Sequence, residues 1–81
     1  MIVHVRLFAR SKDIVGADVV RVELADGACV RDLLEHLAVR YPDLRPLLKH
    51  CRLAAENEFL DDAAPLKDGT EVALLPPVSG G

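Results

Sequence analysis

A single apolar stripe constrains the fold of this chain more than any other feature. From residue 30 to residue 41 the apolar side chains recur every three or four positions, the spacing of a helix with one buried face. They are Val30, Leu33, Leu34, Leu37, Ala38 and Tyr41. Pro42 stops this helix. In a chain of 81 residues, which has room for one small core, the stripe must pack against a layer formed by the rest of the chain.

The remaining apolar segments read as strands that supply this layer. Apolar and polar residues alternate over residues 2–8 and 19–24, and shorter strand patterns follow at 52–56, 58–60 and 71–75. The order predicts an α+β fold in which a mixed sheet packs on one main helix. This is the ubiquitin-like β-grasp arrangement.

Shorter signals fill the gaps between these elements. Residues 9–15 are expected to form a short helix or turn closed by Gly16, and residues 44–48 a short helical turn near Pro46. The first and last strands are apolar enough to be neighbours in the centre of the sheet, and the first two strands form a hairpin-like pair.

The chain ends in a way that suggests a functional tail. Its last six residues are Pro76, Pro77, Val78, Ser79, Gly80 and Gly81. The two prolines fix φ, and glycine lacks Cβ, so the end is thin enough to enter a narrow channel in another protein. We therefore predict a domain over 1–75 and a flexible functional tail over 76–81. The simpler alternative is a frayed terminus, because chain ends are often disordered.

Composition narrows the class of protein. The net charge of −3 argues against nucleic acid as the main partner. No apolar run is long enough to span a bilayer, and the first residues lack the order of a signal peptide, so we expect a cytoplasmic protein without a membrane partner. Cys29 and Cys51 do not form a CxxC pair and are expected to be free thiols.

Charge is distributed unevenly along the sequence. Residues 56–71 hold six acids and one base, whereas residues 31–52 hold five bases and three acids. Solvated surface explains both segments, and an acidic docking face for a basic protein is the sharper alternative for 56–71.

No cluster of residues typical of an active site is recognisable. Ser11 and Ser79 lie outside any nucleophile motif, no glycine-rich phosphate loop is present, and the three histidines are scattered without metal-ligand spacing. We expect no metal site and no permanently bound cofactor. The reactive group is therefore expected at the C-terminus or in a partner.

Several short segments together resemble one family over essentially the whole chain. They are Leu7-Phe8-Ala9, Val15-Gly16, Leu53-Ala54-Ala55 before the Asn57 turn, Pro65-Leu66-Lys67-Asp68-Gly69, Glu71-Val72-Ala73 and the Pro-Pro-Val-Ser-Gly-Gly end. The chain resembles the small subunits of molybdopterin synthase, which are sulfur carriers of the ubiquitin-like superfamily. It departs from them in having Leu74-Leu75 where aromatic residues often precede Pro-Pro, and Cys29 where a capping hydroxyl is usual.

The resemblance implies a chemical role for the terminus. An adenylating enzyme would use ATP to activate the Gly81 carboxylate, and sulfur from a persulfide donor would convert it to a thiocarboxylate. The carrier alone would not be a catalyst. The tail would enter the large synthase subunit, with a heterotetramer expected, and donate sulfur to cyclic pyranopterin monophosphate for molybdenum cofactor biosynthesis.

We predict seven tail and partner-binding residues. They are Gly80, Ser79, Val78, Pro77, Pro76, Leu75 and Phe8. An exposed apolar patch around Phe8, Leu75 and Val78 is the expected partner face, although the aromatic side chain of Phe8 suits the core equally well.

Two alternatives remain open. The chain could be a carrier with the same chemistry for thiamine or another thiolation pathway. It could also be a non-catalytic β-grasp binding module with an inert tail, whose interface is the acidic segment 56–71.

Overall fold

The computed structural model describes residues 1–76. In chain order, its elements are β1 (Ile2–Leu7), α1 (Ala9–Val15), β2 (Val19–Glu23), α2 (Val30–Arg40), the 3-10 turn η1 (Pro42–Leu44), α3 (Arg45–Leu48), β3 (Arg52–Ala55), β4 (Glu58–Leu60) and β5 (Glu71–Leu75). Every strand and helix expected from the sequence is present within about one or two residues of its predicted bounds, the usual uncertainty at element ends. None of the helices in this part of the chain is long and apolar enough to cross a membrane.

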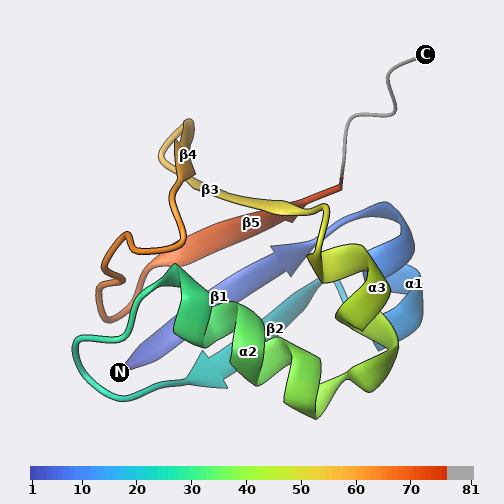
Figure 1. The fold of residues 1–81 in the computed structure, drawn as a ribbon, viewed down its shortest axis with the longest axis horizontal. Coiled ribbons are helices and arrows are strands. Elements are labelled where there is room, and N and C mark those ends of the chain that lie inside the picture. The colour runs from blue at the N-terminus through green and yellow to red at the C-terminus, as the bar shows by residue number, and fades with distance from the viewer. Residues whose placement is uncertain (77–81) are drawn as a thin grey trace.

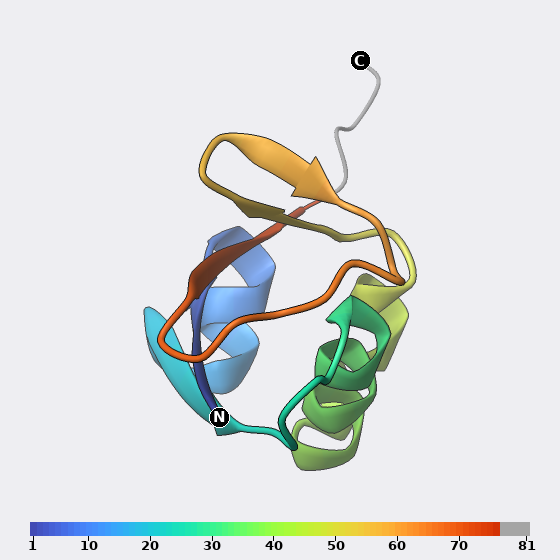
Figure 2. The ribbon, with the colours of Figure 1, turned by 90° about the vertical axis from the view of Figure 1, so that its left-hand side faces the viewer.

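The five strands form one mixed sheet in the order β2-β1-β5-β3-β4. β1 pairs antiparallel with β2 and parallel with β5, and β5 pairs antiparallel with β3. The prediction that the first and last strands are central neighbours is thus confirmed. The sheet curves around α2, with β1 and β2 on one side of the helix and β3 and β4 above it (Figure 2). This is the predicted β-grasp.

The core lies between the sheet and α2. Alternate residues of β1, β2 and β5 are buried, and they form most of the contribution that the sheet makes to the core. The buried apolar residues that form the core are Val3, Val5, Leu7, Val20, Val22, Val30, Leu33, Leu37, Leu44, Leu53, Leu66, Val72 and Leu74. Leu34, Ala38 and Tyr41 complete the predicted stripe but are only half-buried, because they lie at its edge.

The N-terminus of α2 is capped by backbone and carboxylate groups. The backbone N–H of Cys29, at the N-cap, donates a 2.9 Å hydrogen bond to Oδ2 of Asp32. Hydrogen bonds from Cys29 lower the pKa of the Asp32 carboxyl from its ordinary value of 3.8. Asp32 thus supplies one half of a capping box although Cys29 lacks the usual hydroxyl.

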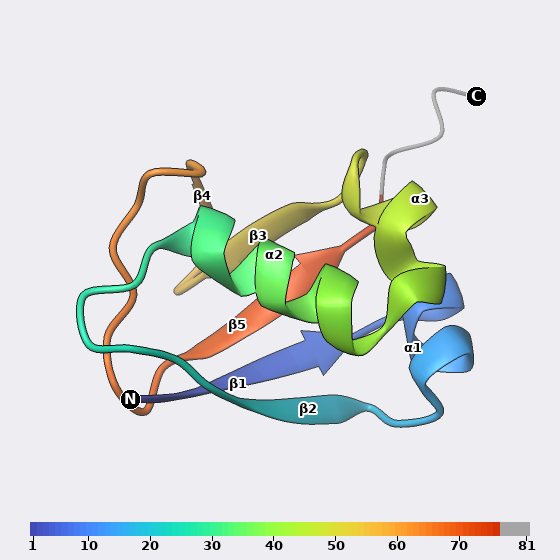
Figure 3. The same ribbon diagram turned by 60° about the horizontal axis from the view of Figure 1, so that its bottom comes forward.

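Two short helices cover the end of the sheet at which β1 and β5 finish. Figures 1 and 3 place α1 and α3 there, beyond the C-terminal end of α2. α1 ends at Gly16, which adopts the left-handed conformation at φ +81°, as its predicted closing role requires. α3 begins at Arg45, so Pro46 lies in its first turn, where a proline is tolerated.

The boundary between the predicted domain 1–75 and tail 76–81 stays a prediction. Pro76 is the last residue that the structure describes, and Pro77, Val78, Ser79, Gly80 and Gly81 lie outside it.

Candidate functional site

The last strand of the described chain, β5, is the central strand of the sheet. β5 lies between β1 and β3, and its residue Leu74 is fully buried opposite Leu7 on one side and Leu53 on the other. The next residue, Leu75, is half-buried and lies opposite Arg52. Because hydrogen-bonded strands flank β5 on both sides, the residue that begins the predicted tail, Pro76, follows a firmly held position (Figure 1).

Phe8 is held at the surface by local hydrogen bonds. It follows β1 at the N-cap of α1, and its side chain is 39% exposed. The buried hydroxyl of Ser11 donates to the Phe8 carbonyl at 2.8 Å and accepts from the Phe8 N–H at 3.3 Å. Ala9 adopts a left-handed φ of +51°, which is uncommon for alanine. The chain therefore turns sharply after β1, and Phe8 is a surface residue rather than a core residue.

Phe8 and Pro76 line the same hollow, which we call the tail-root hollow. Its volume is about 330 Å³. Its lining residues are Phe8, Ala9, Arg10, Ser11, Leu47, Cys51 and Pro76. They come from the residue after β1, from α1, from α3, from the segment between α3 and β3, and from the residue after β5. Segments far apart in the sequence thus meet where the predicted tail begins.

Cys51 contributes a protonated thiol to the tail-root hollow. Its side chain is half-buried, and burial raises the pKa of the Cys51 thiol above its ordinary value of 9.0. A thiol with a raised pKa is a poor nucleophile at neutral pH. The geometry favours the structural role expected for Cys51 over an activated thiol paired with His50.

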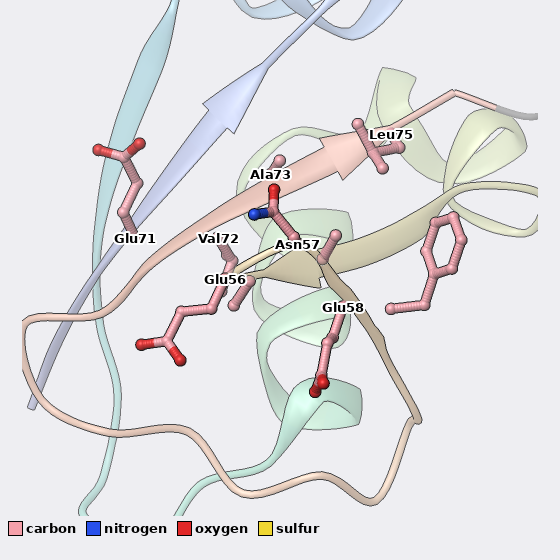
Figure 4. A pocket seen from close by; sticks show the side chains of 10 residues that line it. Glu56, Asn57, Glu58, Glu71, Val72, Ala73 and Leu75 are labelled. Carbon is pink, nitrogen blue, oxygen red and sulfur yellow. The ribbon is translucent and has the colours of Figure 1, made fainter.

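A second hollow lies on the outer face of the sheet, and we call it the sheet-face hollow (Figure 4). Its volume is about 380 Å³. Its lining residues are Ala54, Ala55, Glu56, Asn57, Glu58, Phe59, Glu71, Val72, Ala73 and Leu75. Ala54 and Ala73 are paired across β3 and β5, and their small side chains leave the space open.

Charged and aromatic groups surround the sheet-face hollow. Glu71 accepts a 3.1 Å hydrogen bond from Nε of Arg6 in a solvent-exposed ion pair. The guanidinium of Arg52 lies 4.1 Å from the ring centre of Phe59, which is 58% exposed. The cation–π contact gives this exposed aromatic ring a partner on the surface.

The structure separates two of the residues predicted for the partner face. Phe8 borders the tail-root hollow, whereas Leu75 borders the sheet-face hollow. The third, Val78, belongs with Pro77, Ser79, Gly80 and Gly81 to the segment outside the described residues, so their roles stay predictions. Arg10, Ser11 and Leu47 were not anticipated at the tail root. Nothing in the local pattern of α3 indicated that Leu47 would approach the end of β5.

In residues 1–76, no three His, Cys, Asp or Glu side chains are grouped closely enough to hold a metal ion. The described site consists of two surface hollows on either side of the point where β5 ends.

Comparison with known proteins links this geometry to a family. The model of the ThiS family matches residues 5–81. A Chlamydomonas reinhardtii protein named molybdopterin synthase sulfur carrier subunit is 40% identical over 83 residues, and the match covers all of both chains.

Solved structures agree with the sequence relatives. SAMP1 from Haloferax volcanii is 30% identical, with a TM-score of 0.85 and full coverage of both chains. A chain from the complex of subunits 1 and 2 of the molybdopterin-converting factor of Helicobacter pylori is also 30% identical, with a TM-score of 0.71 and full coverage of both chains. The similarity in fold therefore extends over the whole described sheet.

Proposed function

Because this chain belongs to the ThiS family, we propose that it is a sulfur carrier and the small subunit of a molybdopterin synthase. The observation that carries the proposal is the end-to-end match with a named sulfur carrier subunit, which includes the Gly-Gly terminus. In this role the folded domain is the part of the chain that partner proteins hold, and the reacting group is the Gly81 carboxylate.

The proposed chemistry activates the Gly81 carboxylate, which is a poor electrophile. A carboxylate oxygen of Gly81 attacks the α-phosphorus of ATP on an adenylating partner, pyrophosphate leaves, and an acyl-adenylate forms. The terminal sulfur of a persulfide then attacks the acyl carbon, and AMP leaves. A thiol cleaves the resulting S–S bond, which leaves a thiocarboxylate on Gly81. ATP is thus a substrate of the partner rather than a cofactor bound to this chain.

The thiocarboxylate is a soft nucleophile that the carrier delivers to a second partner. We propose that it donates sulfur to cyclic pyranopterin monophosphate in the large synthase subunit. Tethering the sulfur to a protein raises its effective concentration and orients its attack. Glycine at the last two positions leaves no side chain beside the reacting carbonyl.

The position of β5 supports the proposed separation between a folded domain and a reacting terminus. The predicted tail follows a strand that is paired on both sides, so the strand that precedes it is held independently of any partner. The tail-root hollow and the sheet-face hollow flank its origin and offer apolar surface to a partner.

We propose a large synthase subunit and an adenylating enzyme as the two partners. The relative from Helicobacter pylori was solved as a complex of subunits 1 and 2, which supports the first. We also propose a cytoplasmic location, because a thiocarboxylate and the free thiols of Cys29 and Cys51 require a reducing compartment.

Intact-mass measurement tests the carrier chemistry. The full chain is incubated with an adenylating enzyme, ATP and a persulfide donor, and the expected mass gain is that of replacing one oxygen by sulfur. Deletion of Gly81, or addition of one residue after it, should abolish the gain. A gain that survives either change, or its absence in the native chain, would contradict the proposal.

Genetic complementation separates molybdopterin synthesis from other thiolation pathways. Expression of this chain should restore molybdenum cofactor production in a strain that lacks the small synthase subunit. A chain that gains sulfur in the mass assay but restores only a thiamine-requiring strain would be a carrier for that pathway. A chain without Gly80 and Gly81 that keeps its function would instead be the binding module with an inert tail.

A further inference from the structure

A groove between α2 and α3 shares no lining residue with the tail-root hollow. Its floor is apolar and consists of the half-buried residues Leu34, Ala38 and Leu48. Its volume is about 310 Å³, and its lining comes from α2, from α3 and from Lys49 after α3. Figure 3 shows the two helices next to each other. We call it the α2–α3 groove.

Positive charge borders the apolar floor. Arg31, Arg45 and Lys49 line the groove together with a single carboxylate, that of Glu35. Nε of Arg45 donates to the Ala38 carbonyl at 3.3 Å, which ties this cation to α2. Among residues 1–76, the ion pairs within 4 Å involve other groups, so Arg31 and Lys49 are available to a ligand.

The groove is a basic surface on an acidic protein. The chain carries a net charge of −3, and residues 56–71 hold six carboxylates against one lysine. The folded chain gathers part of its positive charge on the sides of one apolar groove. Such an arrangement favours negatively charged ligands at the groove, because its cations attract carboxylates whereas residues 56–71 repel them.

We propose that the α2–α3 groove binds an acidic amphipathic segment of a partner protein. Aliphatic side chains of the segment would cover Leu34, Ala38 and Leu48, and its carboxylates would pair with Arg31 and Lys49. The α2 residues that line the groove, Arg31 to Ala38, span roughly 10 Å, so a partner helix of about two turns matches this length.

Binding at this groove leaves the tail root open. The neighbouring residues Leu47 and Leu48 of α3 serve different surfaces, since Leu47 lines the tail-root hollow and Leu48 lines the α2–α3 groove. α3 therefore separates the two surfaces. The acidic amphipathic segment of the partner and a second protein that holds the tail can therefore bind this chain at the same time.

Titration of the ¹⁵N-labelled full chain with a synthetic peptide tests the proposal. The probe is a helical peptide with leucines on one face and glutamates on the other. Amide shifts are expected in residues 31–38 and 45–49, with an affinity that falls as salt rises. A peptide of the same composition in scrambled order, and one with lysine in place of glutamate, should bind far more weakly.

Charge-reversal variants locate the contact. Arg31→Glu with Lys49→Glu is expected to weaken peptide binding by about tenfold or more, and the ion pairs account for the loss. Arg21→Glu with Lys67→Glu makes the same change in net charge outside the groove and should change the affinity by less than about twofold. Arg45 is left unchanged because its contact with Ala38 supports the fold.

Three results would overturn the proposal. They are the absence of shifts in the groove at millimolar peptide, shifts confined to β3 and β5, and equal weakening by both variant pairs. Groove shifts that instead appear on concentrating the free chain, with dimer formation, would assign the groove to a second copy. A chain without Gly80 and Gly81 should bind the peptide with unchanged affinity. Failure of the groove proposal can therefore be told apart from failure of the sulfur-carrier proposal.

Discussion

The backbone N–H of Ile2 donates a 2.6 Å hydrogen bond to Oδ1 of Asp68, 66 residues further along the chain. Beside it, the N–H of Gly69 donates to the Ile2 carbonyl at 2.7 Å, and the N–H of His4 donates to the Thr70 carbonyl at 2.9 Å. The turn that leads into β5 is therefore fixed to the start of β1. This contact sets the register of the central parallel pair, from whose far end the predicted tail departs.

Loss of the Asp68 carboxylate should loosen this junction. We expect Asp68→Ala to lower the free energy of unfolding by about 1–2 kcal/mol, because the Ile2 N–H loses a charge-assisted partner. Urea unfolding measures the change. Asp61→Ala is the matched control, since the Asp61 side chain has no recorded hydrogen bond or ion pair among residues 1–76, and an equal loss there would contradict the assignment.

The turn between β3 and β4 is open to stabilisation. Glu56 and Asn57 both adopt positive φ, at 52° and 65°, and two-residue hairpin turns of this kind favour Asn-Gly. The double change Glu56→Asn and Asn57→Gly should raise the free energy of unfolding by about 1 kcal/mol. Thermal unfolding measures the gain. Asn57→Val should lower the melting temperature instead, and a rise with valine would refute the left-handed assignment.

Neighbouring leucines at the end of β5 should differ in their roles. Leu74→Ala should lower the free energy of unfolding by about 2–5 kcal/mol, because its side chain is fully buried. Leu75 is half-buried beside the sheet-face hollow, so Leu75→Ala should cost less than about 1 kcal/mol but weaken binding to the large synthase subunit. Chemical unfolding and calorimetric binding give the two readouts. Unchanged binding by Leu75→Ala would remove Leu75 from the partner face.

Acidification should remove the contribution of the Asp32 cap. The pKa of Asp32 is lowered in the folded state by hydrogen bonds from Cys29, so its stabilisation is present above the ordinary value of 3.8 and is lost as pH falls through the lower folded value. The native chain should therefore be more stable than Asp32→Asn at neutral pH, and the difference should shrink below pH 3.8. Unfolding curves across this range measure it, with Glu35→Gln as control. A difference that is constant with pH would contradict this role.

Local sequence patterns predicted the elements and much of the fold. The alternation of β1 and β2 selected their buried residues, and the stripe of α2 identified the helix that the sheet surrounds. The central pairing of β1 with β5 was predicted because both strands are strongly apolar, as strands buried on one or both faces must be. The resemblance to a known family added the expected chemistry of Gly81, which the spacing of apolar residues cannot indicate.

What the sequence determined by itself is therefore the set of elements and the faces they bury, and it predicted a reactive terminus. Only the tertiary structure decided which surface residues line the same hollow. It placed Phe8 and Pro76 on one hollow, Leu75 on another, and Arg31 and Lys49 on a third. The physical reason is that periodicity reports on contacts within a few residues, whereas these groupings depend on the packing of elements distant in the chain.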